Sequence, residues 1–278
     1  MERERISITL RRQLLQKVDK IVDGMKIRNR SHAIEYLLTK ALGRGISRAV
    51  ILAGGPGTNM RPFTYETPKA LIPVHNKALL EYTIELLKKN QIVDVIISIG
   101  HLGDKVREHF GKGDRFGINI QYVQQPKLVG TGGALAGVAG MFFDEPFILV
   151  HGDILIDIDL EDMISFHRDQ AALVTMALTS AADPSHYGMV SVRRNEVVGF
   201  SEKPDTRSYR SNLINAGLYI CDPMLFDYLP PAESFSLEKD VFPQLIDENK
   251  LAAYMFDGEW FDVGTPEAYE RVLQEWRV

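Results

Sequence analysis

The sequence predicts an α/β protein with a mostly parallel sheet flanked by helices, preceded by a small segment of one strand and two helices. Three observations carry this prediction. Strand and helix patterns alternate through residues 46–278, glycines or carboxylates follow the predicted strands, and the charge changes sign near residue 45. The chain has 278 residues, 45% apolar and 25% charged, which is typical of a globular protein of one or two domains.

The net charge of −5 divides into a basic and an acidic part. Residues 1–45 hold 11 Lys and Arg against 5 Asp and Glu, a charge of +6, which leaves 21 against 32, or −11, for residues 46–278. A basic segment is the usual electrostatic footprint of nucleic-acid binding. We therefore predict two domains, 1–45 and 46–278, with different partners.

Cysteine content and hydropathy exclude several classes of protein. Cys221 is the only cysteine, so neither an internal disulfide nor a cysteine-based metal site can form within one chain. The charged segment MERERISITLRR lacks the apolar core of a signal peptide, and no run approaches the roughly 20 apolar residues of a membrane span. We expect a cytoplasmic protein.

The first 45 residues predict one strand and two helices. Polar and apolar residues alternate over 5–10, helical spacing follows over 14–22, and Ser31 is placed to cap a second helix that ends near Leu42. Such a short segment cannot bury a core of its own, and one isolated strand is unstable. We therefore expect the strands of two chains to pair in a homodimer.

This segment resembles the ribbon-helix-helix family of transcription factors, through its strand and the sequence NRSHAI that opens the second helix. In that family the paired strands lie in the DNA major groove. The resemblance implies that Arg5, Ser7 and Thr9 read base edges. It also implies that the backbone near Arg30 and Ser31 holds a phosphate. The alternative is a dimerisation arm that does not bind DNA.

In the second domain, apolar strands alternate with helices. The predicted strands cover 47–52, 93–99, 118–123 and 146–150, and the predicted helices include 79–88 and 133–141. This βαβ order is typical of a mostly parallel sheet, whose ligands bind beyond the carboxyl ends of the strands.

Glycines and carboxylates follow these strands. The turn AGGPGT, residues 53–58, can bring backbone N–H groups close to a phosphate, although it is not a P-loop because no Gly-Lys-Ser/Thr follows. Asp153 follows the strand 146–150, and Asp262 lies in the sequence WFDVGT. Carboxylates suit Mg²⁺. Together these features indicate chemistry on a nucleotide phosphate.

A series of motifs resembles the sugar-1-phosphate nucleotidylyltransferases in order and spacing. It begins with AGGPGT and PKALIPV and continues with QP, GTG, GD, YG, EKP, NAG and WFDVGT. The resemblance implies a Rossmann-like nucleotidyltransferase fold. It also implies transfer of a nucleoside monophosphate from a nucleoside triphosphate to a sugar 1-phosphate, with release of pyrophosphate.

The resemblance also implies roles for individual residues. The nucleotide-binding residues would be Leu52, Ala53, Gly54, Gly55, Gly57, Thr58, Gln125 and Gly130. The sugar-phosphate-binding residues would be Gly188, Glu202, Lys203 and Asn215. The catalytic residues would be Lys69, Asp153 and Asp262, with Lys69 near the α-phosphate and the two aspartates holding magnesium. His151, beside one of these aspartates, is expected to pack the site rather than act as a base.

One position departs from the family's pattern and leaves two functions open. Asn59 stands where the family usually has an arginine that stabilises the triphosphate, and loss of one charge donor costs on the order of a hundredfold to a thousandfold in rate. The leading hypothesis is an active nucleotidylyltransferase. The alternative is a DNA-binding transcriptional regulator that uses a catalytically weakened transferase domain as a nucleotide or nucleotide-sugar sensor.

The segment SLEKDVFP, residues 236–243, bears on the substrate. It resembles the corresponding segment of the mannose-1-phosphate guanylyltransferases, which favours GTP and mannose 1-phosphate. Thymidylyl or uridylyl transfer to glucose 1-phosphate remains the alternative.

Overall fold

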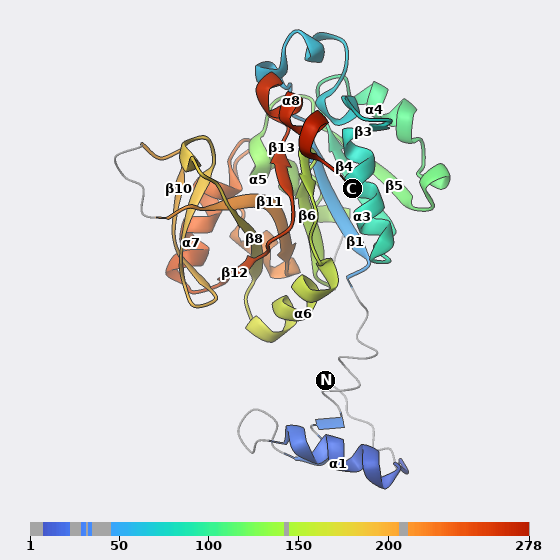
Figure 1. The fold of residues 1–278 in the computed structure, drawn as a ribbon, viewed down its shortest axis with the longest axis vertical. Coiled ribbons are helices and arrows are strands. Elements are labelled where there is room, and N and C mark those ends of the chain that lie inside the picture. Colours follow the sequence, from blue (N-terminus) through green and yellow to red (C-terminus); the bar gives the residue numbers. More distant parts are fainter. Residues whose placement is uncertain are drawn as a thin grey trace. The chain divides into compact units, whose positions relative to one another are not determined.

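The computed structural model describes residues 8–22, 29–31, 33–34, 46–141, 145–205 and 211–277. The chain divides into two compact units, Met1–Gly45 and Ile46–Val278, and Figure 1 shows the elements of each. Within these ranges, no helix is both long and apolar enough to cross a membrane.

The second unit contains a nine-stranded sheet in the order β5-β4-β1-β6-β11-β8-β12-β10-β9, as far as the described residues show. The strands are β1 Arg48–Ala53, β4 Asp94–Ile99, β5 Asn119–Gln124, β6 Phe147–His151, β8 Val174–Ser180, β9 Gly188–Arg193, β10 Glu196–Glu202, β11 Leu213–Cys221 and β12 Leu251–Met255. The predicted α/β fold with a central sheet flanked by helices is confirmed.

Strands β5, β4, β1 and β6 are parallel and coincide with the four predicted strands. Ile51 at the centre of β1 pairs with Ile97 of β4 on one side and Val150 of β6 on the other. Strands β4, β1 and β6 are apolar along most of their length because helices cover both faces of the sheet, whereas β5 at the sheet edge mixes polar and apolar residues.

Beyond β6 the sheet becomes mixed. β11 runs antiparallel to β6 and β8, and at Ile214 also to β9. β10 runs antiparallel to β12 and β9, whereas β8 and β12 are parallel. The sheet is therefore parallel in one half and mixed in the other. The apolar pattern of β11 shows that it is buried, but it carries no information on its direction or its neighbours.

Two short ladders lie outside the main sheet. In the first, β2 Pro73–Val74 pairs with β3 Lys77–Ala78. In the second, β7 Ile154–Ile156 pairs with β13 Trp260–Asp262, and Asp262 faces Ile154. The second ladder brings Asp262 close to the segment that follows β6.

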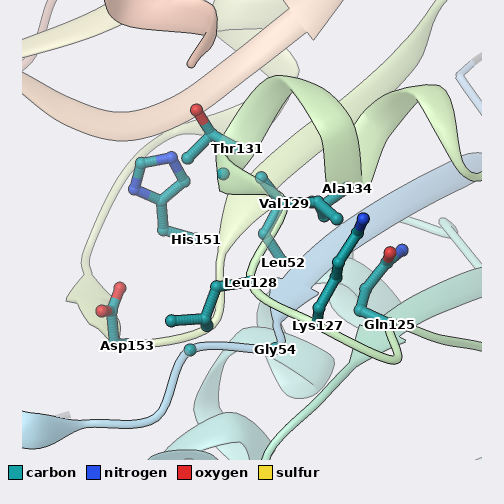
Figure 2. Close-up of a pocket in the computed structure, with 12 residues that line it drawn as sticks. Leu52, Gly54, Gln125, Lys127, Leu128, Val129, Thr131, Ala134, His151 and Asp153 are labelled. Carbon is teal, nitrogen blue, oxygen red and sulfur yellow. The ribbon is translucent and has the colours of Figure 1, made fainter. Parts of the chain in front are cut away.

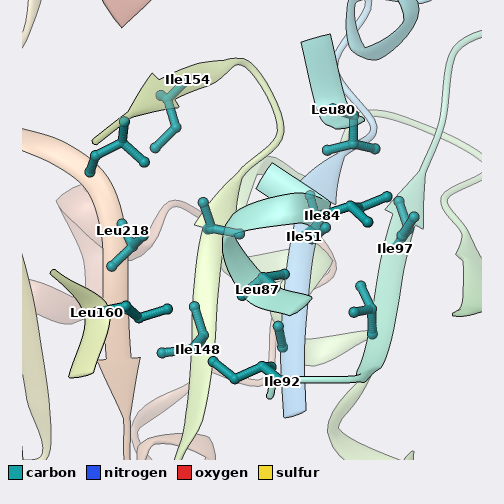
Figure 3. Packing of buried hydrophobic residues seen from close by; sticks show 14 of the residues in the cluster. Ile51, Leu80, Ile84, Leu87, Ile92, Ile97, Ile148, Ile154, Leu160 and Leu218 are labelled. Carbon is teal, nitrogen blue, oxygen red and sulfur yellow. The ribbon is translucent and has the colours of Figure 1, made fainter. Parts of the chain in front are cut away.

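Helices of the second unit pack on both faces of its sheet. They are α3 Leu79–Lys89, α4 Gly103–Phe110, α5 Gly130–Ala136, α6 Leu160–Gln170, α7 Phe242–Asp247 and α8 Pro266–Glu275, whereas α1 Arg12–Ile21 belongs to the first unit. On one face, Ile84 and Leu87 of α3 pack against the sheet near Ile51, as Figure 3 shows. On the other face, Leu135 of α5 and Phe242 of α7 belong to a second buried cluster.

The helix predicted over 133–141 begins and ends earlier, at Gly130–Ala136. The segment around Phe235 explains the early start, since the N–H groups of Gly132 and Gly133 donate to the Phe235 carbonyl. Gly130 has φ +74° and lies so close to the Phe235 backbone that a side chain would overlap it. This contact is tertiary, so the local pattern does not reveal it.

The first unit contains α1, close to the helix predicted over 14–22, and a second helical turn at residues 30, 31, 33 and 34. The Ala33 N–H donates to the Asn29 carbonyl at 2.9 Å. The turn therefore begins before Ser31, and Ser31 lies inside it rather than capping it.

The residues predicted to bind DNA are described in part. Thr9 is exposed and lies outside any strand of this single chain, and Arg5 and Ser7 fall outside the described residues, as does most of the predicted second helix. The Arg30 guanidinium donates two hydrogen bonds, of 2.6 and 2.8 Å, to the Asp19 carboxylate of α1. This side chain therefore joins the two helical segments of the unit.

Candidate active site

The predicted functional residues lie beyond the carboxyl ends of parallel strands. Gly54 follows β1, Gln125 follows β5, and Asp153 follows β6. Because β5, β4, β1 and β6 are neighbours, these positions share one edge of the sheet. The carboxyl edge is where sheets of this kind hold their ligands.

A cavity of about 250 Å³ opens at this edge, as Figure 2 shows. Five of the residues expected to bind a nucleotide line it, namely Leu52, Gly54, Gly55, Gln125 and Gly130. Its described wall does not include the other three, Ala53, Gly57 and Thr58. Leu128, Val129 and Ala134 add an apolar surface of the kind on which a base can pack.

Gln125 is held at the wall of this first cavity by β4. Its backbone N–H donates to the Ile99 carbonyl at 2.7 Å, and its side-chain amide donates to the Ser98 hydroxyl at 3.2 Å. Ser98 is completely buried, so the amide is oriented by a partner that cannot move into solvent.

Lys69 lies between the two predicted aspartates. Its Nζ atom is 2.6 Å from Asp153 Oδ2 and 3.6 Å from Asp262 Oδ1. The Lys69 side chain is 16% exposed, and the aspartate side chains are 37% and 34% exposed. The Val263 N–H donates to the Asp153 carbonyl at 2.9 Å, which fixes the two acidic segments together.

The charges of these three groups depend on one another. Burial lowers the pKa of Lys69, but the Asp153 and Asp262 charges outweigh it and hold that pKa above its ordinary value. Burial would raise the pKa of Asp153, yet the Lys69 ammonium holds it below its ordinary value. The pKa of Asp262 is raised, first by burial and then by the Asp153 charge.

The two aspartates fit a magnesium ion. Asp262 Oδ1 is buried and accepts no hydrogen bond from the described residues, so it has capacity for a cation. The described residues hold no cluster of three or more His, Cys, Asp or Glu side chains. Mg²⁺ commonly binds through one or two carboxylates, with water and substrate phosphates as its other ligands, so this donor set suffices.

A second cavity of about 420 Å³ adjoins the first. All four residues expected to bind the sugar phosphate line it, namely Gly188, Glu202, Lys203 and Asn215, and Asp262 lines it as well. Gly130, Thr131, His151 and Asp153 line both cavities. Asp153 therefore lies where two ligands would meet.

Local packing positions the residues of the second cavity. The Asn215 side-chain amide donates to the Tyr219 hydroxyl at 2.6 Å, and its oxygen accepts the Gly217 N–H at 3.0 Å. Gly188 lies under the Phe200 ring, which a side chain would overlap. Burial and the Glu238 charge raise the pKa of Glu202.

Sequence reasoning did not assign several residues of the second cavity. Thr131, Glu238, Lys239 and Trp260 line it. Thr131 and Trp260 lie in motifs of the series, and Glu238 and Lys239 lie in the segment 236–243, but these patterns do not show which side chains face the cavity. His151 lines both cavities and packs edge-to-face on Tyr219 with ring centroids 5.8 Å apart.

The loop with the unusual asparagine lies beside the first cavity. Asn59 is exposed in a 3₁₀ turn, Thr58–Met60. The Thr64 hydroxyl donates to the Gly57 carbonyl at 2.7 Å and holds the loop. The Arg61 guanidinium stacks 5.2 Å from the Tyr65 ring centre, so it does not take the place of the missing arginine.

Comparisons with known proteins agree with this geometry. Residues 48–277 match the protein family described as nucleotidyl transferase. The chain is 33% identical over 242 residues to the UTP–glucose-1-phosphate uridylyltransferase of Synechocystis sp., which covers 82% of this chain. It is 34% identical over 226 residues to the mannose-1-phosphate guanylyltransferase of Mycobacterium tuberculosis, which covers 80%. The chain spans 62% of the length of each relative.

A solved structure shares the fold. It is a protein from Bacillus anthracis, described as a glucose-1-phosphate thymidylyltransferase in complex with a sucrose. The TM-score is 0.75 and the identity 26%, and the match covers 82% of this chain and 94% of that one.

Proposed function

Because the chain belongs to the nucleotidyl transferase family, we propose that it transfers a nucleoside monophosphate from a nucleoside triphosphate to a sugar 1-phosphate. The observation that carries the proposal is the pair of adjoining cavities that share Asp153, with Lys69 and Asp262 at the same place. A reaction between two bound phosphates requires this arrangement.

The first cavity takes the nucleotide and the second takes the sugar 1-phosphate. An oxygen of the sugar phosphate attacks the α-phosphorus, a new P–O bond forms, and the bond to the β-phosphate breaks, so that pyrophosphate leaves. The chain mainly has to hold the two reactants in line and offset the charge that develops. Lys69 remains protonated beside its carboxylates and supplies one positive charge near the α-phosphate.

Asp153 and Asp262 would hold magnesium, which would offset the negative charge that develops on the phosphates. In the second cavity, Glu202 and Asn215 would contact sugar hydroxyls, and Lys203 the sugar's phosphate. Removal of divalent cations with EDTA should abolish turnover, and Mg²⁺ should restore it.

For the substrates, we propose GTP and mannose 1-phosphate. The support is the segment 236–243, which supplies Ser236, Glu238 and Lys239 to the wall of the second cavity. Relatives named for glucose 1-phosphate and for mannose 1-phosphate are both about one third identical to this chain, so thymidylyl or uridylyl transfer to glucose 1-phosphate is the competing pair.

For the N-terminal unit, we propose a homodimer or higher oligomer formed through the strand predicted over residues 5–10, with DNA contacts from the same segment. The support is the charge of +6 over residues 1–45 and the amphipathic helix α1. In the described residues of the second unit, Lys69 and both aspartates lie together as catalysis requires, which supports the enzyme over the sensor hypothesis that Asn59 raises.

The decisive experiment is a pyrophosphate-release assay with each common nucleoside triphosphate and sugar 1-phosphate. We expect release with GTP and mannose 1-phosphate to exceed release with every other pair. Release with no pair at all, by a folded chain supplied with Mg²⁺, would refute the proposed activity. Faster release with a glucose 1-phosphate pair would correct the substrate only.

A further inference from the structure

Glu238 is a buried acid in the wall of the second cavity, with 8% of its surface exposed. It lies in the turn Leu237–Val241, next to a segment that is bonded to the start of α5. The Phe235 N–H donates to the Val129 carbonyl at 3.0 Å, and the Phe235 carbonyl accepts from Gly132 and Gly133. The backbone that carries Glu238 is therefore held firmly in place.

One oxygen of the Glu238 carboxylate is fully used. Glu238 Oε2 accepts a hydrogen bond of 2.6 Å from the Thr131 hydroxyl and another of 2.6 Å from the Ser236 hydroxyl. The Thr131 oxygen accepts the Leu237 N–H at 3.0 Å, so this hydroxyl is fixed as well. Two short bonds to the same oxygen hold the carboxylate in one orientation.

The other oxygen has no donor. Glu238 Oε1 is buried and has no hydrogen-bond partner among the described residues, and the same is true of His151 Nε2. The two atoms are 3.6 Å apart, which is too long for a hydrogen bond. Buried polar atoms are nearly always paired, so these two atoms, which lie within ion-pair range but make no hydrogen bond, leave one donor and one acceptor for a bound group.

A hydroxyl group fits this gap chemically. It can donate its proton to Glu238 Oε1 and accept a hydrogen bond from His151 Nε2 when the imidazole carries its proton there. One oxygen within hydrogen-bond reach of both atoms can span a 3.6 Å separation.

We infer that Glu238 and His151 together recognise one hydroxyl group of the sugar and so help to determine which sugar 1-phosphate is accepted. The inference rests on the proposed function, because it takes the second cavity as the sugar-phosphate site. Glu238 adds an acceptor to those of Glu202 and Asn215 in the same cavity. Thr131, whose hydroxyl orients Glu238, also lines the first cavity, so the same residue lies beside the sites proposed for both ligands.

The test combines protein variants with sugar analogues. Wild type, Glu238→Gln and His151→Phe are assayed with the preferred sugar 1-phosphate and with analogues that each lack one hydroxyl. Glu238→Gln keeps the volume and an oxygen that can accept from Thr131 and Ser236, and His151→Phe keeps a ring on Tyr219. Asp240→Asn is the matched control, because the Asp240 carboxylate accepts the Ser236 N–H but does not line the cavity.

We expect wild type to use one analogue about tenfold to a hundredfold less well than the parent sugar, the usual effect of losing one hydrogen bond to a charged group. In both variants this penalty should shrink to about threefold or less, while the ratios for the other analogues stay at their wild-type values. Asp240→Asn should keep every wild-type ratio. Unchanged ratios in Glu238→Gln and His151→Phe, with all sugars slowed equally, would overturn the inference.

Calorimetric binding of the same sugar 1-phosphates provides a readout without turnover. If wild type binds the sugars and the variants lose the same discrimination, the hydroxyl contact stands even where the pyrophosphate assay shows no activity. If wild type binds the sugars but no analogue differs from the parent, the inference fails and the proposed function is untouched. Absence of sugar-phosphate binding by wild type would overturn both.

Discussion

Replacing Lys69 with methionine keeps the approximate length of the side chain and removes the ammonium that lies 2.6 Å from Asp153 and 3.6 Å from Asp262. Two carboxylates then face each other without a counter-ion. The Lys69 charge is the main factor that holds down the pKa of Asp153, so that pKa should rise in the variant.

The size of the effect follows from the exposure of the three groups. Removing one partner of a fully buried ion pair costs about 3–5 kcal/mol, because the remaining charge is left unpaired. Here the aspartate side chains are 37% and 34% exposed, so water screens much of their charge. We expect the free energy of unfolding to fall by about 1–2 kcal/mol. The value of kcat/KM should fall on the order of a hundredfold to a thousandfold.

Urea denaturation and pyrophosphate release measure the two effects separately. Lys77→Met is the control, because Lys77 forms an exposed ion pair of 2.7 Å with Glu85, far weaker in its contribution to stability. The control should lose no more than about 1 kcal/mol and none of its activity. A folded Lys69→Met variant with wild-type kcat/KM would refute the role given to Lys69, and an equal loss in Lys77→Met would show that the effect is not specific.

Three further predictions concern other parts of the chain. Asn59→Arg should raise kcat/KM on the order of a hundredfold, because it restores a charge donor near the expected triphosphate position. Asn59→Gln, the control, should not raise it. No gain with arginine would show that this loop does not limit the rate. His167 is buried and bonded to Thr175, and burial lowers its pKa from 6.5 to about 4 although the Asp222 charge opposes the shift. The unfolded chain therefore binds a proton before the folded one does, so urea denaturation should show about 2 kcal/mol of stability lost between neutral pH and about pH 5. His167→Gln should lack that part of the loss, and an equal loss in the variant would contradict the assignment. Arg5→Ala should weaken binding to duplex DNA and reduce its salt dependence, and binding equal to wild type at every salt concentration would remove the proposed groove contact.

The fold could be predicted in the half of the sheet where local pattern and topology agree. The apolar runs at β1, β4, β5 and β6 are short and bounded by turns, and connections through helices make such strands parallel. β11 has an equally apolar run, but it lies antiparallel between β6 and β8. An apolar run shows that a strand is buried. Its position in the sheet and its direction depend on the complete set of neighbouring strands.

The candidate site could be predicted as a list of residues but not as a geometry. The motif series names Lys69, Asp153, Asp262 and the four residues expected to bind the sugar phosphate, because each motif keeps its residues at a constant spacing. Asp153 and Asp262 are 109 positions apart, and nothing in the sequence between them shows that both side chains contact the same Lys69 ammonium. The pairing of β7 with β13 brings them together.

Sequence alone determined the division of charge near residue 45, the buried strands and the residue types available for phosphate chemistry, because these properties depend on composition and short-range pattern. Tertiary structure decided which of those residues meet. Glu238 and His151 are the clearest case, since a glutamate and a histidine 87 positions apart are ordinary residues in the sequence. They become an unpaired acceptor and donor only when the fold buries both beside one cavity and leaves them 3.6 Å apart.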